Sequence, residues 1–193
     1  MKIERPKAKQ TMPDSAKKVF SGKIYDVYQW EQKMYDGSVA VFERLKRADT
    51  VSIIPVTVDG QIIVGLQEQP GTQAHFAPIA GRVDAGEETF AAAKRELLEE
   101  TGYEAAEWSL LHAYQPTMKI EWAIFTFVAR GCKQISEQSL DAGEKIELKF
   151  LSFEEFIEMA ARGDFGEHEL KIMALEAKLD EKKMETLRKE VLG

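Results

Sequence analysis

The residues best suited to chemistry lie in one short segment, GRVDAGEETFAAAKRELLEETGY, which covers residues 81–103. It fits the spacing G-x5-E-x7-R-E-U-x-E-E-x-G-U, in which U is apolar, at every charged and glycine position. If each fixed identity occurs at roughly one position in fifteen, all of them coincide by chance on the order of once in 10^8 starting points. The spacing therefore indicates a functional motif.

The second half of this segment predicts a helix. Residues 90–101 are rich in Ala, Leu, Glu, Lys and Arg, Thr89 is a candidate cap, and Gly102 is a typical terminator. At about 100° per residue, one stripe that carries Phe90 and Leu97 is predicted to face the core. The i, i+3 and i+4 spacing predicts a second face that carries three carboxylates, those of Glu96, Glu99 and Glu100.

Three carboxylates so close together repel one another, and without compensation at least one of them takes up a proton. A divalent cation removes this conflict. Oxygen ligands without His or Cys favour Mg2+, with Mn2+ as a substitute, over Zn2+. The alternative is a solvated acidic helix face, but such a face requires neither Gly81 and Gly86 nor the remote Glu87. Arg95 is interpreted as a structural partner of a neighbouring glutamate, with direct contact to the substrate as the alternative.

This segment resembles the signature box of the Nudix hydrolases, which cleave nucleoside diphosphates linked to another moiety. The resemblance implies a loop-helix-loop in which Glu96, Glu99 and Glu100 bind the metal together with the backbone carbonyl of Ala80. It also implies that Glu87 lies near the metal through water. Tyr103, where the family prefers an aliphatic residue, is the single departure from the box and concerns packing.

Strand and helix signals surround the box. Residues 23–44 predict a hairpin that turns at Asp36-Gly37, and SIIPVTV and QIIVGLQ predict a second hairpin around Asp59-Gly60. Further predicted elements are strands at 110–114, 121–129 and 147–151, a helix at 153–162, and a helical pattern over 168–189. This order indicates an α+β layered fold.

The resemblance, which covers roughly residues 49–178, sharpens this to a Nudix fold with a mixed β-sheet sandwiched between helices. It implies an N-terminal antiparallel β subdomain over residues 1–48 and a Nudix hydrolase domain with a C-terminal helix over 49–193. The order of an antiparallel piece, then R-x-D-T-V-S-I-I-P-V, then the box is most similar to the ADP-ribose and nucleotide-sugar pyrophosphatase branch. There the N-terminal strands exchange between subunits and help to build the nucleotide site, which implies a homodimer.

Composition limits the partners. The chain has 193 residues, 44% of them hydrophobic, with a net charge of -7 and a pI near 5.2. Such acidity argues against nonspecific binding to nucleic acid or to anionic membranes. Cys132 is the only cysteine, so no intramolecular disulfide can form, which fits a reducing cytoplasm. The basic start MKIERPKAKQ is followed by no apolar run, and we expect a cytoplasmic protein.

Hydrolysis of a diphosphate also needs a base for the attacking water. The loop at 136–147, SEQSLDAGEKIE, offers four acids: Glu137, Asp141, Glu144 and Glu147. In the resembled branch an acid from the loop before the strand that leads to the final helices takes this role, and Glu144 fits best. Glu99 is an alternative base. The candidate catalytic residues are therefore Glu144, Glu99 and Glu100.

The substrate contacts depart from the branch. Where many members have Q-Y-R after the hairpin, this chain has Gln67-Glu68-Gln69, so a cation for the phosphates is missing there. The candidate substrate-binding residues are Arg44, Arg47, Gln69, Arg82 and Glu121. The indole of Trp122 is placed either to stack on a base or sugar or to be buried in its strand.

The sequence thus indicates Mg2+-dependent hydrolysis of the P-O-P link of a nucleoside diphosphate sugar, with ADP-ribose and GDP-mannose-like sugars equally compatible. The products would be a nucleoside monophosphate and a sugar phosphate. The alternatives are a dinucleoside polyphosphate or noncanonical NTP as substrate, or a non-catalytic Nudix-fold ligand sensor. Such sensors usually lose box glutamates, and this chain keeps all of them.

Overall fold

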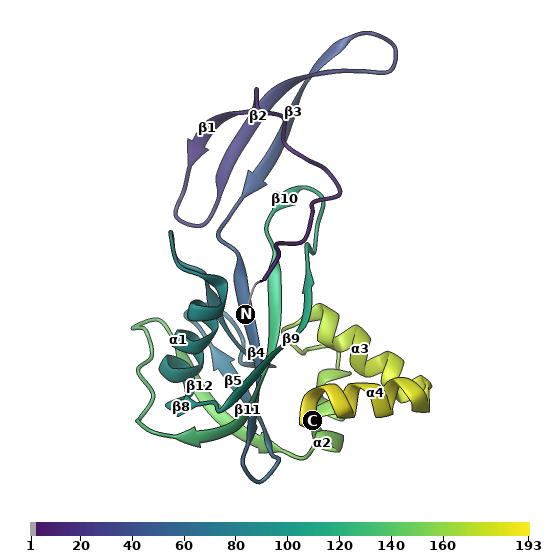
Figure 1. Cartoon of the computed structure of the whole chain (residues 1–193). Helices are drawn as coiled ribbons and strands as arrows, with labels where there is room; N and C mark the ends of the chain where they lie inside the picture. The colour runs from purple at the N-terminus through teal and green to yellow at the C-terminus, as the bar shows by residue number, and fades with distance from the viewer. Residues whose placement is uncertain (1–2) are drawn as a thin grey trace.

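An antiparallel hairpin of apolar and polar alternation forms the N-terminal part of the molecule (Figure 1). The computed structural model describes residues 3–193. Strands β2 (Asp26–Lys33) and β3 (Val39–Lys46) pair with Trp30 opposite Phe42, and the chain turns at Gly37 with φ +88°. This predicted hairpin is confirmed. β1 (Lys17–Ser21) adds an exposed edge strand, and β10 (Ile120–Glu121) pairs in parallel with β3.

The second sheet has eight strands and forms the centre of the molecule. Its main order is β12-β5-β4-β11-β8, with β6, β7 and β9 paired to β5, β4 and β11. β4 and β11 are parallel and the other pairs are antiparallel, so the sheet is mixed, as predicted. The bounds are β4 Thr50–Thr57, β5 Ile62–Glu68, β6 His75–Ala77, β7 Ile79–Arg82, β8 Tyr103–Glu104, β9 Glu107–Tyr114, β11 Ile124–Gln134 and β12 Lys145–Leu151.

Helices cover both faces of this sheet. α1 (Thr89–Thr101) lies on one side, and α2 (Phe153–Ala160), α3 (His168–Leu179) and α4 (Glu181–Leu192) lie on the other (Figure 1). Adjacent residues of β4 serve opposite faces, because Ile53 packs in the cluster of α1 and Ile54 in that of α2 to α4. A strand buried on both faces reads as a nearly continuous apolar run, which explains SIIPV.

Several predicted boundaries differ from the structure. The single helical pattern over 168–189 is two helices, because Asp180 has an extended backbone and its side chain accepts from the backbone N–H groups of Lys182 and Lys183 to cap α4. Thr89 is not a cap; Glu88 precedes α1 and makes no side-chain cap bond. The strand predicted at 121–129 begins at Ile124, and the helix predicted at 153–162 ends at Ala160.

The two sheets meet where β3 continues into β4. Across this junction Leu45 N–H donates to Lys119 O at 3.0 Å and Arg47 N–H donates to Glu121 O at 3.2 Å. A short piece of the later chain is thereby joined to the N-terminal sheet. Among residues 3–193, no helix has the length and apolar character required to cross a membrane.

Candidate active site

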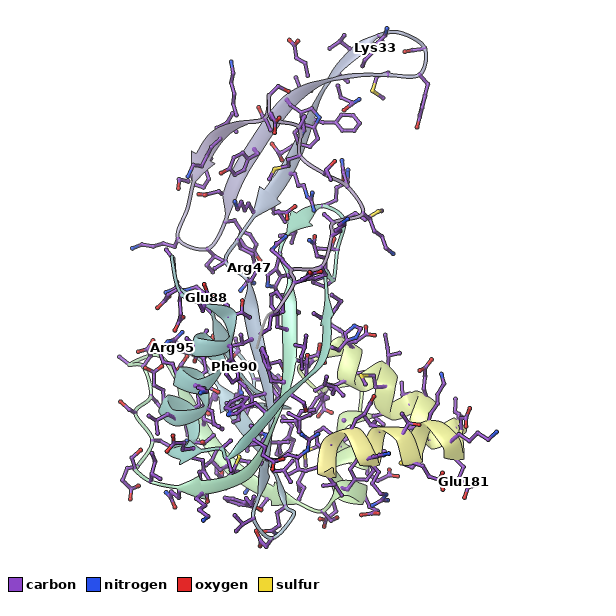
Figure 2. The ribbon with its side chains drawn as sticks, in the orientation of Figure 1. Lys33, Arg47, Glu88, Phe90, Arg95 and Glu181 are labelled. Carbon is purple, nitrogen blue, oxygen red and sulfur yellow. The ribbon has the colours of Figure 1, made fainter. Side chains whose placement is uncertain are left out.

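Helix α1 presents the two faces that its spacing predicts. Phe90 packs edge-on against Trp108, with ring centroids 5.5 Å apart, and Leu97 is buried in the core. Figure 2 shows Phe90 toward the central strands and Arg95 on the other side of the helix. At the end of α1, Gly102 has φ +76° and donates its N–H to Leu98 O at 2.8 Å. Because glycine has no Cβ, it adopts this left-handed backbone conformation without the steric strain that another residue would have, and the helix ends here.

The first glycine of the box makes room for a carboxylate. β7 pairs with β4 and places Gly81 against α1, where a Cβ on Gly81 would lie 1.8 Å from Cδ of Glu96. No side chain fits at that distance. The absence of a side chain at Gly81 therefore leaves the space that the Glu96 carboxylate occupies, and a larger residue would displace that carboxylate.

The carboxylate of Glu100 is the most deeply buried of the box acids. Its residue is 5% exposed, and its Oε2 accepts the N–H of Ala80 at 3.0 Å. Burial, together with the charges of nearby glutamates, raises the pKa of Glu100 to about 8. Burial also raises the pKa of Glu96, against the opposing effect of Arg95. Two desolvated carboxylates with a charge conflict are the chemistry that a divalent cation resolves, so the residues present fit Mg2+.

Arg95 holds the acids of the box together. Its Nη1 donates to Glu96 at 2.8 Å and to Glu99 at 3.0 Å, and its Nε and Nη2 donate to both oxygens of Glu87 at 3.0 and 2.9 Å. The predicted structural role of Arg95 is confirmed. The same guanidinium holds the pKa of Glu87 below its usual range. Glu87 also accepts the N–H of Asp84, so it braces the box loop.

The loop before β12 is bonded to the end of α1. Ser139 N–H donates to Glu99 O at 2.8 Å, and Gln138 Nε2 donates to Glu100 O at 2.6 Å. A hollow of about 430 Å3 results, lined by residues that include Glu96, Glu99, Glu100, Asp141 and Glu144. Of the four loop acids, Asp141 and Glu144 thus reach the box, whereas Glu147 pairs with Lys149.

The pairing of the box acids with Arg95 sets their arrangement in this hollow. Within the part of the chain that the structure describes, no group of three or more His, Cys, Asp or Glu side chains is arranged to hold a metal ion. Arg95 instead supplies positive charge to Glu96 and Glu99. The histidines His75, His112 and His168 take no part in this hollow.

A larger cavity of about 1000 Å3 lies between the N-terminal sheet and the box loop. It shares Arg82 and Asp84 with the acidic hollow, so the two spaces meet at these residues. Its lining carries five cations, Arg5, Lys23, Lys46, Arg47 and Arg82, against four carboxylates, Asp26, Asp49, Asp84 and Glu121. A mixed, slightly positive wall suits an anionic ligand with polar groups.

Three of the predicted substrate residues line this cavity. Arg47 lies at the junction of the two sheets (Figure 2), with its guanidinium carbon 4.5 Å from the Trp122 ring and 5.7 Å from the Tyr25 ring. Trp122 is therefore stacked on an arginine, and its Nε1 donates to Thr50. The other two residues on the cavity wall are Arg82 and Glu121.

The structure does not bring the other two predicted substrate residues to either space. Arg44 has a side chain that is 0% exposed and pairs with Glu121 at 2.9 Å. Gln69 lies in an exposed turn and exchanges backbone and side-chain bonds with Thr72. Sequence reasoning also missed Arg5, which lines the larger cavity; its only signal was the basic character of the N-terminal stretch.

Comparison with known proteins agrees with this geometry. The NUDIX domain model matches residues 46–174. The chain belongs to the Nudix family. It is 28% identical over 144 residues to an ADP-ribose pyrophosphatase of Bacillus subtilis (strain 168), covering 73% of this chain and 78% of the relative. It is also 28% identical over 144 residues to a methanol dehydrogenase activator of Bacillus methanolicus, covering 72% of this chain and 77% of that protein.

A solved structure shares the fold of this Nudix chain. The structure described as an ADP compounds hydrolase matches with a TM-score of 0.68 and 19% identity, and the match covers 93% of this chain and 95% of the other. The predicted Nudix fold and the resemblance to the ADP-ribose pyrophosphatase branch are confirmed. As a Nudix hydrolase, the protein is a pyrophosphohydrolase.

Proposed function

We propose that this Nudix hydrolase cleaves the P-O-P link of ADP-ribose or a similar nucleoside diphosphate sugar to a nucleoside monophosphate and a sugar phosphate. One observation carries the proposal. The acidic hollow of the box and the larger mixed-charge cavity share Arg82 and Asp84, so one ligand can reach both. A diphosphate with a group on each side has the shape that such a two-part site accepts.

The metal site follows from the buried acids. Glu96, Glu99 and Glu100, with the carbonyl of Ala80, would hold Mg2+ or Mn2+, which supplies charge neutralisation at the diphosphate and a polarised water. The desolvation of Glu100 and the close approach of Glu96 to Gly81 support this assignment. For these acids to serve as ligands, Arg95 must give up part of its pairing with Glu96 and Glu99.

Glu144 is our proposed general base. It lines the hollow with the box acids, and its charge acts on both Glu96 and Glu100. A carboxylate beside the reacting phosphate can accept the proton of the attacking water. Asp141 and Glu99 are the alternatives that share the hollow.

The larger cavity would hold the part of the substrate beyond the phosphates. Arg47 and Arg82 are the cations on its wall that can meet the diphosphate, and Arg47 is pre-positioned by its stacking on Trp122. The stack fixes the guanidinium before the ligand arrives, which lowers the entropy lost on binding. ADP-ribose is favoured among the sugars because the Bacillus subtilis relative is an ADP-ribose pyrophosphatase.

A substrate panel with product identification tests the proposal. The protein would be incubated with Mg2+ and, separately, ADP-ribose, GDP-mannose, UDP-glucose, diadenosine polyphosphates and noncanonical NTPs. We expect ADP-ribose to give AMP and ribose 5-phosphate. Turnover of only the diadenosine polyphosphates or NTPs would show that these compounds, and not nucleoside diphosphate sugars, are the substrates. Tight binding of ADP-ribose without turnover of any compound would favour a non-catalytic ligand sensor.

A further inference from the structure

The first described residues tie the two parts of the molecule together. We call residues 3–10 the N-terminal strap; it runs from beside β4 past β10 to the N-terminal sheet (Figure 1). Ile3 packs against the core cluster of α1. Pro6 O accepts from Gln115 Nε2 at 2.9 Å, and Gln10 O accepts from Arg44 Nη1. The strap therefore bonds to both sides of the junction between the two sheets. The larger cavity lies at this junction.

Arg5 makes the strongest of these contacts. Its Nε and Nη2 donate to the two oxygens of Asp49 at 2.7 and 3.0 Å, and its Nη1 donates to Glu121 at 2.6 Å. The side chains of Asp49 and Glu121 are only 19% and 16% exposed, so both carboxylates depend on protein partners for compensation. A bidentate arginine contact fixes orientation as well as charge.

Both acidic partners connect Arg5 to the walls of the site. Asp49 Oδ1 also accepts the N–H of Ala123 at 2.8 Å, and Asp49 O accepts the N–H of Val83 at 2.9 Å, next to Arg82. The second oxygen of Glu121 pairs with the buried Arg44 of β3. Through Asp49, Arg5 is therefore connected to the start of β4, the residue before β11 and the box loop. Through Glu121 it is connected to the N-terminal sheet.

We propose that Arg5 is a positioning residue for this enzyme: through Asp49 and Glu121 it holds the box loop against the N-terminal sheet and neutralises the cavity wall that faces an anionic substrate. Without Arg5 the lining would carry four cations against four carboxylates, Asp49 would lose its guanidinium partner, and Glu121 would keep only Arg44. Such a lining has lost the net positive charge that attracts a diphosphate, and the contact between the start of β4 and the N-terminal strap is gone. The kinetic part of this inference rests on the proposed function.

The kinetic test compares Arg5→Ala, Arg5→Lys and Lys7→Ala. Lys7 is an exposed cation of the same strap for which no ion pair appears among residues 3–193, so its variant removes the same charge without the contacts. For ADP-ribose, we expect Arg5→Ala to raise KM about tenfold with kcat within about twofold, and Arg5→Lys to recover part of the loss. Lys7→Ala should match the wild type. An unchanged KM in Arg5→Ala overturns the proposal.

A second readout needs no substrate. Hydrogen exchange would be followed at the amides of Leu45 and Arg47, which bond across the junction to Lys119 and Glu121, and at the amides of α1 as reference. We expect Arg5→Ala to exchange faster at Leu45 and Arg47 and unchanged in α1. Equal exchange in all segments overturns the proposal. If the wild type turns over no compound of the panel, the proposed function fails, and this exchange comparison alone still decides the role of the strap.

Discussion

At the scale of single residues, two features determine the site: the lack of space for a side chain at Gly81 and the burial of the Glu100 carboxylate. Gly81 lies so close to Glu96 that a methyl group there would overlap the carboxylate, with 1.8 Å between Cβ and Cδ. A substitution must displace either β7 or the glutamate. Both changes act on the acids that we assign to the metal.

We expect Gly81→Ala to lose activity by about 100-fold or more, because misplacing a ligand by about 1 Å has effects of that size. The protein should remain folded, since the strain is confined to one helix face. Gly163→Ala is the matched control, because a Cβ on Gly163 meets nothing within 4 Å. Steady-state rates with Mg2+, beside circular dichroism, check this. Normal turnover in Gly81→Ala would mean that Glu96 has no part in catalysis.

Glu100 links the metal site to stability. Its folded-state pKa is raised from 4.5 to about 8, so between these values the folded protein binds more protons than the unfolded chain. The unfolding free energy of the metal-free protein should therefore fall as pH rises through this window. Glutamine cannot ionise and keeps an oxygen for the Ala80 N–H, so Glu100→Gln removes the buried charge.

In EDTA at about pH 9, we expect Glu100→Gln to be more stable than the wild type by about 1–3 kcal/mol, with little difference at about pH 4. Added Mg2+ should stabilise the wild type and not the variant, since the ligand is lost. Thermal unfolding across pH, with and without the metal, measures both effects. Identical pH profiles for the two proteins would show that Glu100 is already ionised without metal.

At the scale of elements, local patterns were sufficient where a periodicity extends over several residues. Both hairpins and helix α1 follow from alternation, turn residues and 3.6-residue spacing. β8 and β10 have two residues each, too few for any period, and exist because a longer strand pairs with them. The break at Asp180 is hidden because apolar positions continue through it.

The candidate site likewise has one part that local sequence patterns predict and another part that they do not. The shared face of the three box glutamates is a property of one helix and was predictable from spacing. The burial of Arg44 against Glu121 and the reach of Arg5 to Glu121, across 116 residues, depend on how the two sheets meet. No local pattern encodes that contact. Gln69 lines neither the hollow nor the larger cavity, and the sequence around it does not encode where its turn lies relative to them.

The loop over residues 136–144 is the element that carries the proposed base. Hydrogen bonds from this loop to the carbonyl oxygens of Glu99 and Glu100 hold it against the end of α1. Glu144 therefore lines the hollow. We expect Glu144→Gln to lower kcat about 100-fold or more with little change in Mg2+ affinity, a size typical of a lost general base. Glu137→Gln, from the same loop but outside the hollow, is the control. Full activity in Glu144→Gln would move the base to Asp141 or Glu99.

At the scale of the whole molecule, the N-terminal sheet has a single layer and an uncovered apolar surface. Val39 and Val41 project from the same face of β3 and are 62% and 68% exposed, and Val19 of the edge strand β1 lines the same shallow depression as Val41. Exposed valines gathered on one sheet offer apolar surface that an interface can bury. We propose a second copy of this chain as its occupant, in agreement with the homodimer that the family resemblance implies.

A pair of valine substitutions tests this arrangement. Val41→Lys places a charge in the proposed interface, whereas Val58→Lys places the same charge at a position of nearly equal exposure, 65%, just after β4. We expect the wild type and Val58→Lys to be dimers by light scattering and Val41→Lys to be monomeric. The free energy required to bury an unpaired lysine in an apolar contact exceeds the binding free energy of a small interface. Since the N-terminal sheet also walls the larger cavity, the monomer should show a raised KM with an intact box. A monomeric wild type, or a dimeric Val41→Lys, would place the role of this sheet within a single chain.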